Sequence, residues 1–283
     1  MLRAVLFIVL GLIAGCGGQA VLAPATAQTA GASQILVLAS QPSEIDLWRA
    51  ALESPRTVNL QGRLFTVGTY AGRSVAAGIA GIGLVNSGAG AALAIEEFQP
   101  RAVLFNGTAG GLGVATGDVV LGERCIQYSF AFQNATAYQP WPTFPNDQPP
   151  PPAQLVRNPL YFAADPTLLA AGERAASTVS LPPLTFAGQT RQPGVVKAGI
   201  NTGDVFSVDL QANLTEAQQT GCQLFEQEGA AVAQICYQLS IPCLIVRSVS
   251  NPADESGFAI YEELGDVAAD NAQRVTMEIV KQL

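Results

Sequence analysis

Residues 225–236 read FEQEGAAVAQIC, an apolar run that carries two acids and leads at once into small residues. The run that begins at Cys222 predicts a β-strand, and the residues from Gly229 onward predict a helix suited to close packing on a sheet. IPCLIVRSVS, residues 241–250, then predicts a second buried strand. A strand, a helix and a strand in succession form the unit of an α/β domain, so this stretch indicates the fold class.

The same alternation fills the rest of the chain from residue 34 onward. Helix 43–52 follows the first strand, with Ser43 as the expected N-cap. No linker interrupts the pattern, so we predict one α/β domain over 34–283, built around a central sheet. Further strands are expected over 34–40, 101–107, 117–123 and 194–201 and as a pair within 63–81, and further helices over 86–98, 165–177, 210–221 and about 256–283.

The composition excludes several kinds of site. Hydrophobic residues make up 49% of 283 residues, and the formal net charge is −8, so nucleic acid is not expected as a partner. The chain has no histidine, which excludes Ser-His-Asp and Cys-His catalysis and His-ligated zinc. No cofactor or metal is expected, because no CxxC spacing is present. Four cysteines are expected to be buried thiols whose spacing cannot pair them, namely Cys125, Cys222, Cys236 and Cys243.

The N-terminus has the pattern of an export signal. MLRAVLFIVLGLIAGCGG combines the basic Arg3 with an apolar segment too short to span a bilayer, which predicts a signal peptide over 1–15. IAGC resembles a lipobox, so Cys16 is expected to be the lipidated N-terminus and 16–33 a flexible tether. The alternative is ordinary cleavage after Ala27. We therefore expect an exported protein, held to a bacterial membrane only by a lipid anchor or otherwise secreted or periplasmic.

A proline-rich segment, QPWPTFPNDQPPPPA at 139–153, contains seven prolines. Proline lacks a backbone N–H and has a fixed φ, so no regular secondary structure is expected there. We interpret the segment as a surface loop rather than a functional lid.

Two stretches that follow predicted strands are candidates for ligand contacts. NGTAGGLG, residues 106–113, has glycines that let a backbone approach a ligand, but it is not a dinucleotide or triphosphate loop. NTGDVFSVD, residues 201–209, contains Asp204, which fits a structural turn. Phe206 fits either a core ring or an aromatic face for a flat ligand.

The two acids of FEQEGAAVAQIC suggest a sugar ligand. In an extended segment Glu226 and Glu228 point the same way. Capping of the following helix explains one acid at this position, but it does not explain two. A carboxylate accepts hydrogen bonds from both hydroxyls of a vicinal diol, which makes ribose a sensible ligand.

Taken together, these stretches resemble the nucleoside phosphorylase/nucleosidase superfamily, and within it the methylthioadenosine/S-adenosylhomocysteine nucleosidases. The resemblance runs from about Gln34 to the C-terminus and rests on GIGLVNSGAGAA, NGTAGGL, GDV, TGDVFS, EQEGAAVAQIC and VRSVSNPAD, in that order. It implies a central mixed β-sheet flanked by helices, a purine nucleoside as small-molecule ligand, and a homodimer or higher homo-oligomer.

The resemblance also implies roles for single residues. Glu44 matches the acid that activates the attacking water, and Glu228 matches the acid that holds the ribose hydroxyls. Phe206 matches the ring that stacks on the purine, and Ser207 matches the neighbour whose backbone meets the base edge. The remaining matches are Thr108, Ala109 and Gly110 beside sugar and base, Gln227 where the family usually has Met under the sugar, and Glu226 as a second acid flanking the diol.

One position departs from the nucleosidase pattern. Asn251 stands where these enzymes have an Asp that donates a proton toward purine N7. An amide donates a hydrogen bond but does not transfer a proton as a carboxylic acid does, so either the substrate or the rate must differ. Trimeric purine nucleoside phosphorylases also use Asn here, which would favour 6-oxopurines. Asp254 is expected to be a poor substitute.

Hydrolysis is expected rather than phosphorolysis. Phosphorolysis needs a cationic phosphate pocket, and the stretches 81–86 and 106–113 contain no Arg or Lys. The prediction is therefore a purine nucleosidase that cleaves the N-glycosidic bond. The alternatives are a nucleoside-binding or storage protein without catalysis, and a purine nucleoside phosphorylase.

Overall fold

The structure is a computed structural model that describes residues 34–135, 138–143, 158–186 and 188–283. The expected signal peptide, the tether and Cys16 lie outside the described residues. The compact unit that contains the fold comprises Gly31–Leu283. Within the described ranges, no helix has both the length and the apolar character that a membrane span requires.

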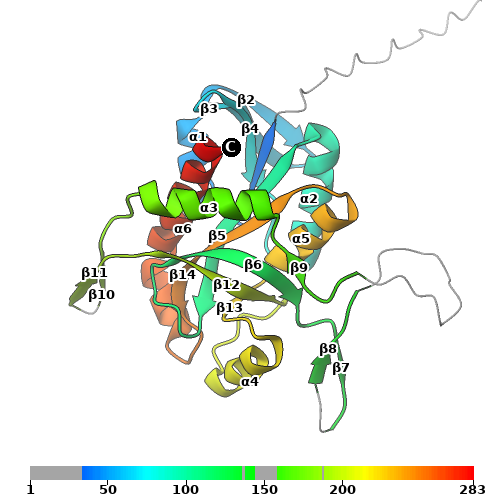
Figure 1. Ribbon diagram of the computed structural model, residues 1–283, viewed down its shortest axis with the longest axis vertical. Helices are drawn as coiled ribbons and strands as arrows, with labels where there is room; N and C mark the ends of the chain where they lie inside the picture. The colour runs from blue at the N-terminus through cyan, green and yellow to red at the C-terminus, as the bar shows by residue number, and fades with distance from the viewer. Residues whose placement is uncertain (1–33, 136–137, 144–157, 187) are drawn as a thin grey trace, which may run out of the picture. The chain divides into compact units, whose positions relative to one another are not determined.

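A mixed β-sheet forms the centre of this unit, as expected (Figure 1). Its strands run in the order β13-β12-β6-β14-β5-β1-β4-β3-β2, and the short β9 pairs with β6. The strands β1, β4, β5 and β14 are mutually parallel, whereas β6 is antiparallel to β14. The bounds are β1 Ile35–Ala39, β2 Glu53–Leu60, β3 Arg63–Tyr70, β4 Arg73–Ile79, β5 Ala102–Gly111, β6 Val119–Gln127, β9 Phe162–Ala163, β12 Val195–Thr202, β13 Leu224–Glu226 and β14 Cys243–Pro252. Two small hairpins complete the strands, with β7 Ala131–Gln133 and β8 Tyr138–Pro140 in one and β10 Leu184–Phe186 and β11 Gln189–Arg191 in the other.

The sheet curls so that β13, at one end of the strand order, also meets β5. β13 pairs in parallel with β12 and also antiparallel with the end of β5, through Leu224 opposite Gly111 and Phe225 opposite Gly110. The strands β13, β12, β6, β14 and β5 therefore form a closed ring. As a result, the start of β13 lies against the C-terminal end of β5, because the two strands run in opposite directions.

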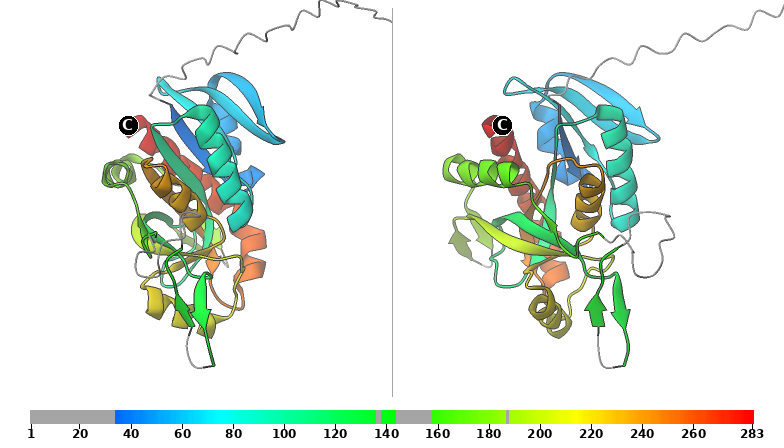
Figure 2. Two further views of the ribbon diagram at one scale, coloured as in Figure 1. Left: turned by 90° about the vertical axis from the view of Figure 1, so that its right-hand side faces the viewer. Right: turned by 45° about the vertical axis from the view of Figure 1, so that its right-hand side comes forward.

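Helices cover both faces of the sheet (Figures 1 and 2). On β1, Leu36 and Leu38 face one apolar cluster, and Ile35 and Val37 face the other, as the alternation of a strand requires. The first cluster includes residues of α2 and α5, and the second includes residues of α1, α3 and α6. The helices are α1 Asp46–Ala51, α2 Leu84–Phe98, α3 Pro166–Thr178, α4 Leu210–Thr220, α5 Gly229–Gln238 and α6 Gly257–Gln282.

Several expectations about individual elements need correction. Ser43 does not cap α1, because it lies inside a 3₁₀ turn, Pro42–Glu44, that precedes the helix. The Gly-rich stretch is not a loop after a strand, because β5 continues to Gly111 through pairing with β14. Part of the proline-rich segment is regular, since β8 pairs with β7. The sequence analysis did not identify β2, which pairs with β3 at the edge of the sheet.

Candidate active site

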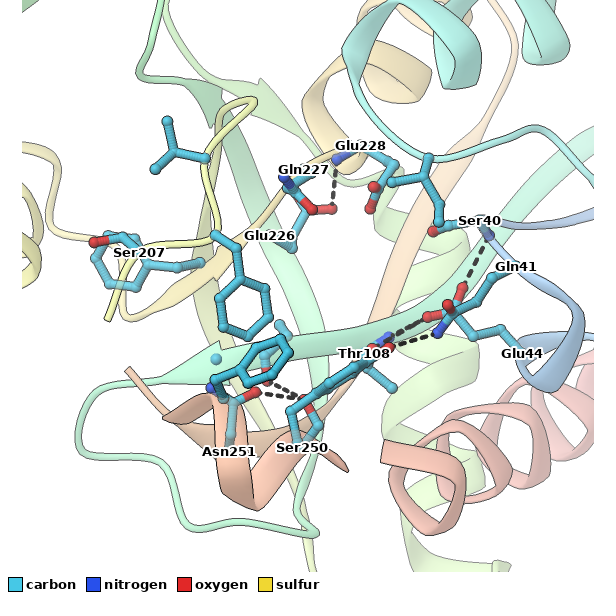
Figure 3. A pocket seen from close by; sticks show the side chains of 18 residues that line it. Ser40, Gln41, Glu44, Thr108, Ser207, Glu226, Gln227, Glu228, Ser250 and Asn251 are labelled. Carbon is cyan, nitrogen blue, oxygen red and sulfur yellow. Dashed lines mark hydrogen bonds between the residues drawn. The ribbon is translucent and has the colours of Figure 1, made fainter. Parts of the chain in front are cut away.

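A pocket lies where the ends of β1, β5, β12, β13 and β14 come together (Figure 3). All ten residues predicted for catalysis or substrate binding line it, so the fold brings every one of them together. The lining residues are Ser40, Gln41, Glu44, Ile82, Thr108, Ala109, Gly110, Val205, Phe206, Ser207, Phe225, Glu226, Gln227, Glu228, Ser250, Asn251, Phe258 and Tyr261.

Glu44 is held rigidly at one side of this pocket. Its Oε1 accepts hydrogen bonds from the backbone N of Thr108 at 3.0 Å and from Thr108 Oγ1 at 3.2 Å. Its Oε2 accepts from the backbone N of Ser40 at 2.9 Å, and the residue is 2% exposed. Figure 3 shows these bonds converging from β5 and from the end of β1. Three donors fix the carboxylate in one orientation, as the orientation of an attacking water requires.

Arg247, on β14, lies beneath the carboxylates, and the sequence analysis did not identify it. Its Nη2 donates to Glu226 Oε2 at 2.5 Å and to Glu228 Oε2 at 3.3 Å, and its guanidinium carbon lies 4.4 Å from the centre of the Phe105 ring. Burial lowers the pKa of Arg247, but the carboxylates of Glu226, Glu228 and Glu44 together raise it above its ordinary value. The arginine therefore carries the positive charge that keeps these acids in a buried site.

Gly107 makes room for this arginine. A Cβ at position 107 would lie 1.9 Å from Arg247 Nη1 and 2.9 Å from Glu44 Oε1. The glycine of NGTAGG therefore allows a close approach of side chains to β5. We expected the glycines of this stretch to make room for a ligand, whereas Gly107 makes room for the side chains of Arg247 and Glu44.

The two acids of FEQEGAAVAQIC, Glu226 and Glu228, have different hydrogen-bond partners. Glu226 accepts hydrogen bonds from the backbone N of Glu228 and of Gly229, from Thr202 Oγ1 and from Arg247. It therefore satisfies the start of α5, although Glu228 is the acid that directly precedes this helix in the sequence. Four donors use the acceptor capacity of a carboxylate, so the geometry favours a positioning role for Glu226 over direct contact with a diol.

The side chain of Glu228 crosses instead to the start of α2. Its Oε1 accepts from the backbone N of Gly83 at 3.0 Å, and Asp204 Oδ1 accepts from the next backbone N, that of Leu84, at 2.8 Å. The structural role expected for Asp204 is therefore a cap on α2. Desolvation raises the pKa of Glu228 to about 7, opposed by Arg247 and assisted by Glu226. Glu228 thus titrates near neutrality beside the pocket.

Aromatic rings form the opposite, more open part of the site. Phe206 follows β12, lines the pocket and is 45% exposed. Its ring centre lies 5.9 Å from that of Phe258 and 5.8 Å from that of Tyr261, both edge-on. Ser207 and Gln227 also line the pocket. These apolar faces suit a flat heterocycle, so the structure favours the ligand-facing role of Phe206 over a core role.

Asn251 lies at this same end, near the end of β14. Its Oδ1 accepts from Ser250 Oγ at 2.8 Å, and its Nδ2 donates to the backbone O of Pro252 at 2.9 Å. The amide nitrogen has a second N–H available for a base. Asp254 is turned away, with its Oδ1 accepting from the backbone N and Oγ of Ser256, and it does not line the pocket. Asp254 therefore does not replace the missing acid.

A family model supports the resemblance over the whole domain. The model described as the phosphorylase superfamily matches residues 34–281. The chain belongs to this superfamily. It is 30% identical over 255 residues to the 5′-methylthioadenosine/S-adenosylhomocysteine nucleosidase of Mycobacterium bovis. The aligned region covers 87% of this chain and 96% of the relative.

Solved structures of the phosphorylase superfamily agree with this assignment. The nucleosidase of the same name from Neisseria meningitidis, in complex with methylthio-immucillin-A, superimposes with a TM-score of 0.73 at 30% identity and covers 89% of this chain and 100% of that one. Futalosine hydrolase of Helicobacter pylori gives a TM-score of 0.73 at 20% identity, with coverage of 89% and 99%, and shares the fold. The predicted superfamily, its nucleosidase branch and the fold class are confirmed.

Proposed function

We propose that this protein is a purine nucleosidase that hydrolyses the N-glycosidic bond. The observation that carries the proposal is the pairing of Glu44 and Glu228 in one pocket, each fixed by different partners. Among the described residues that line the pocket, none is Arg or Lys, and the fully buried Arg247 forms ion pairs with Glu226 and Glu228. A site without a free cation suits water better than phosphate as the nucleophile.

In this proposal each group has its own task. Glu44 orients and deprotonates the attacking water as positive charge develops on the sugar. Glu228, when ionised, accepts hydrogen bonds from the ribose hydroxyls, and its negative charge stabilises the oxocarbenium-like transition state. Phe206 stacks on the base, and the free N–H of Asn251 donates to it as it leaves. The relatives named as methylthioadenosine/S-adenosylhomocysteine nucleosidases support this reaction class.

The test is a base-release assay on adenosine, inosine and methylthioadenosine, with and without phosphate. We expect free base and free ribose or its 5′-derivative at rates that phosphate does not change. Glu44→Gln should lower kcat by about 10²–10⁴-fold, since it removes the general base. Glu97→Gln, on the exposed face of α2, is the matched control and should retain activity.

Each alternative gives a different result in this assay. Release of ribose 1-phosphate only in the presence of phosphate would identify a phosphorylase. Calorimetric binding of a nucleoside without any turnover would identify a binding or storage protein. Either result would overturn the proposed hydrolysis.

We also propose that the enzyme acts outside the cytoplasm, anchored by lipid at Cys16. The support is the N-terminal sequence, whose residues lie outside those described. Mass spectrometry of the mature N-terminus should find a lipidated cysteine. A chain that begins at Gln28 or retains Met1 would contradict it. A homo-oligomer, also proposed from the resemblance, is tested by light scattering.

A further inference from the structure

We propose that the pocket selects purine ribonucleosides with an unmodified 5′-hydroxyl, through Gln41 and Tyr261. The inference rests on the proposed function and adds the class of substrate. It concerns two polar side chains that line the pocket and have no task in the hydrolysis described above.

Gln41 and Tyr261 both line the pocket and form a hydrogen-bonded pair. Gln41 follows β1, and Tyr261 lies in the first turns of α6, 220 positions along the chain. Gln41 Nε2 donates to the Tyr261 hydroxyl oxygen at 2.9 Å, and both residues are half-buried. The tyrosine oxygen is the acceptor in this bond, so its own O–H still has a proton to donate. Gln41 Oε1 is an acceptor beside it. The pair therefore offers one donor and one acceptor, close together.

The position of the pair identifies the part of the substrate that it meets. Gln41 precedes Glu44 by three residues, and Figure 3 shows both on the side of the pocket opposite Ser207 and Asn251. In the proposed binding mode the base lies beside Asn251 and the anomeric carbon lies beside Glu44. The nucleoside therefore extends from the Asn251 side of the pocket toward the Gln41 side. Glu228 engages the 2′ and 3′ hydroxyls, which leaves the substituent on C4′ to face the pair.

The chemistry of the pair fits a hydroxyl and not a thioether. A 5′-hydroxyl accepts from the Tyr261 O–H and donates to Gln41 Oε1, so every polar group has a partner. A methylthio group has only a weak acceptor and no donor. It would cover the two protein groups from water without replacing the lost bonds, and an unpaired polar group costs more than a missing contact. The pair therefore discriminates against the methylthio substrate named for the relatives.

The sharpest test compares adenosine with 5′-deoxyadenosine, because the two differ only in this hydroxyl. We expect kcat/KM to be about tenfold or more higher for adenosine, the discrimination typical of a half-exposed hydrogen-bonded site. Methylthioadenosine should be disfavoured to a similar or greater extent. Equal kcat/KM for adenosine and 5′-deoxyadenosine would overturn the inference.

Two variants show whether the pair is responsible. In Gln41→Met and in Tyr261→Phe, the ratio of kcat/KM for adenosine to that for 5′-deoxyadenosine should fall toward one. Tyr237→Phe, an exposed tyrosine on α5 outside this pocket, is the matched control and should keep the wild-type ratio. A ratio that survives in both pocket variants would assign the selection to other residues and contradict the inference. Failure of the proposed function is distinct from this, since no base would then be released from any nucleoside.

Discussion

The two ends of the pocket are built in opposite ways. We call them the sugar end, where Glu44, Glu226 and Glu228 are proposed to face the ribose, and the base end, where Phe206 and Asn251 are proposed to face the purine. At the sugar end Arg247 is 0% exposed, Glu44 is 2% exposed, and each carboxylate has assigned donors. At the base end Phe206 and Phe258 are 45% and 57% exposed. The groups there are rings and the amide of Asn251, and none of them is charged.

This difference separates a buried, charged part of the pocket from an exposed, uncharged part. A buried charge needs an opposite charge or hydrogen-bond donors beside it, and Glu44, Glu226 and Glu228 all have such partners, so these carboxylates are held in place before a ligand arrives. An exposed ring has no such requirement and can adjust to different bases. We therefore expect variants at the sugar end to affect both folding and rate, and variants at the base end to affect substrate choice.

The largest effect is expected from Arg247→Met. It leaves Glu226 and Glu228 as buried acids without their cation, and breaking a buried pair in this way costs about 3–5 kcal/mol. Urea denaturation followed by circular dichroism measures this loss. Lys281→Met removes an exposed ion pair with Glu278 and should change the free energy of unfolding little. Equal stability of the wild type and Arg247→Met would show that the two ends do not differ in this respect.

A smaller effect is expected from Asn251→Asp at the base end. A carboxylic acid here could protonate the departing adenine, which an amide cannot do, so kcat on adenosine should rise by about 10²-fold, the low end for general acid catalysis. The gain should be smaller or reversed on inosine, whose O6 accepts from the Asn amide. Steady-state kinetics on both substrates provide the measurement, after circular dichroism has shown an intact fold. Unchanged adenosine rates would mean that Asn251 does not contact the leaving base.

The smallest effect is a pH dependence of sugar binding. Burial raises the pKa of Glu228 to about 7, so between pH 6 and pH 8 its carboxyl changes from mostly neutral to mostly ionised and gains acceptors for the diol. Affinity for adenosine should therefore increase about tenfold over this range. Calorimetry with Glu44→Gln, which suppresses turnover, measures it, and the Glu44→Gln/Glu228→Gln double variant should lack the dependence. A flat profile in Glu44→Gln would contradict this assignment.

Ionisation of Glu228 is expected to increase affinity for the sugar but to decrease the free energy of unfolding. The pKa of Glu228 is higher in the folded chain than its ordinary value of 4.5, so the folded chain holds an extra proton between these two values. The free energy of unfolding should therefore decrease as pH rises from about 4.5 to about 7, and this contribution should then level off.

Much of the fold could be predicted from the sequence because the buried elements are dense in apolar residues. β1, β12 and β14 lie near their expected ranges, and the site residues were assigned through the resemblance of several motifs to the nucleosidases. β2 was missed because its residues are polar and largely exposed, with Pro55 among them. Gly110 and Gly111 were assigned to a loop because glycine is a poor strand former, whereas pairing with β13 and β14 holds them in the sheet.

Arg247 illustrates what local reasoning does not reveal. One arginine in an apolar strand gives no sign of its partners, because Glu226 and Glu228 precede it by 21 and 19 positions and Glu44 comes from the other end of the domain. The exchange of capping roles between Glu226 and Glu228 was hidden for the same reason. The closed ring of strands brings Glu226 and Glu228 to Arg247, and the pairing of β1 with β5 adds Glu44.

That ring is closed by β13, a strand of three residues that pairs with β5 through Leu224 and Phe225, and the backbone N of Leu112 continues the contact by donating to the backbone O of Gln223. We call this pairing of β13 with β5 the seam. Glu226 and Glu228 lie at the end of β13 and just after it, whereas Glu44 is hydrogen-bonded to Thr108 on β5. Contacts so distant along the chain are slow to form, and a short seam is where a protein opens locally. Hydrogen exchange at the amides of β13 would therefore follow the lifetime of the assembled site itself. An opened seam would separate the acid that holds the sugar from the acid that activates water while most of the core remained folded.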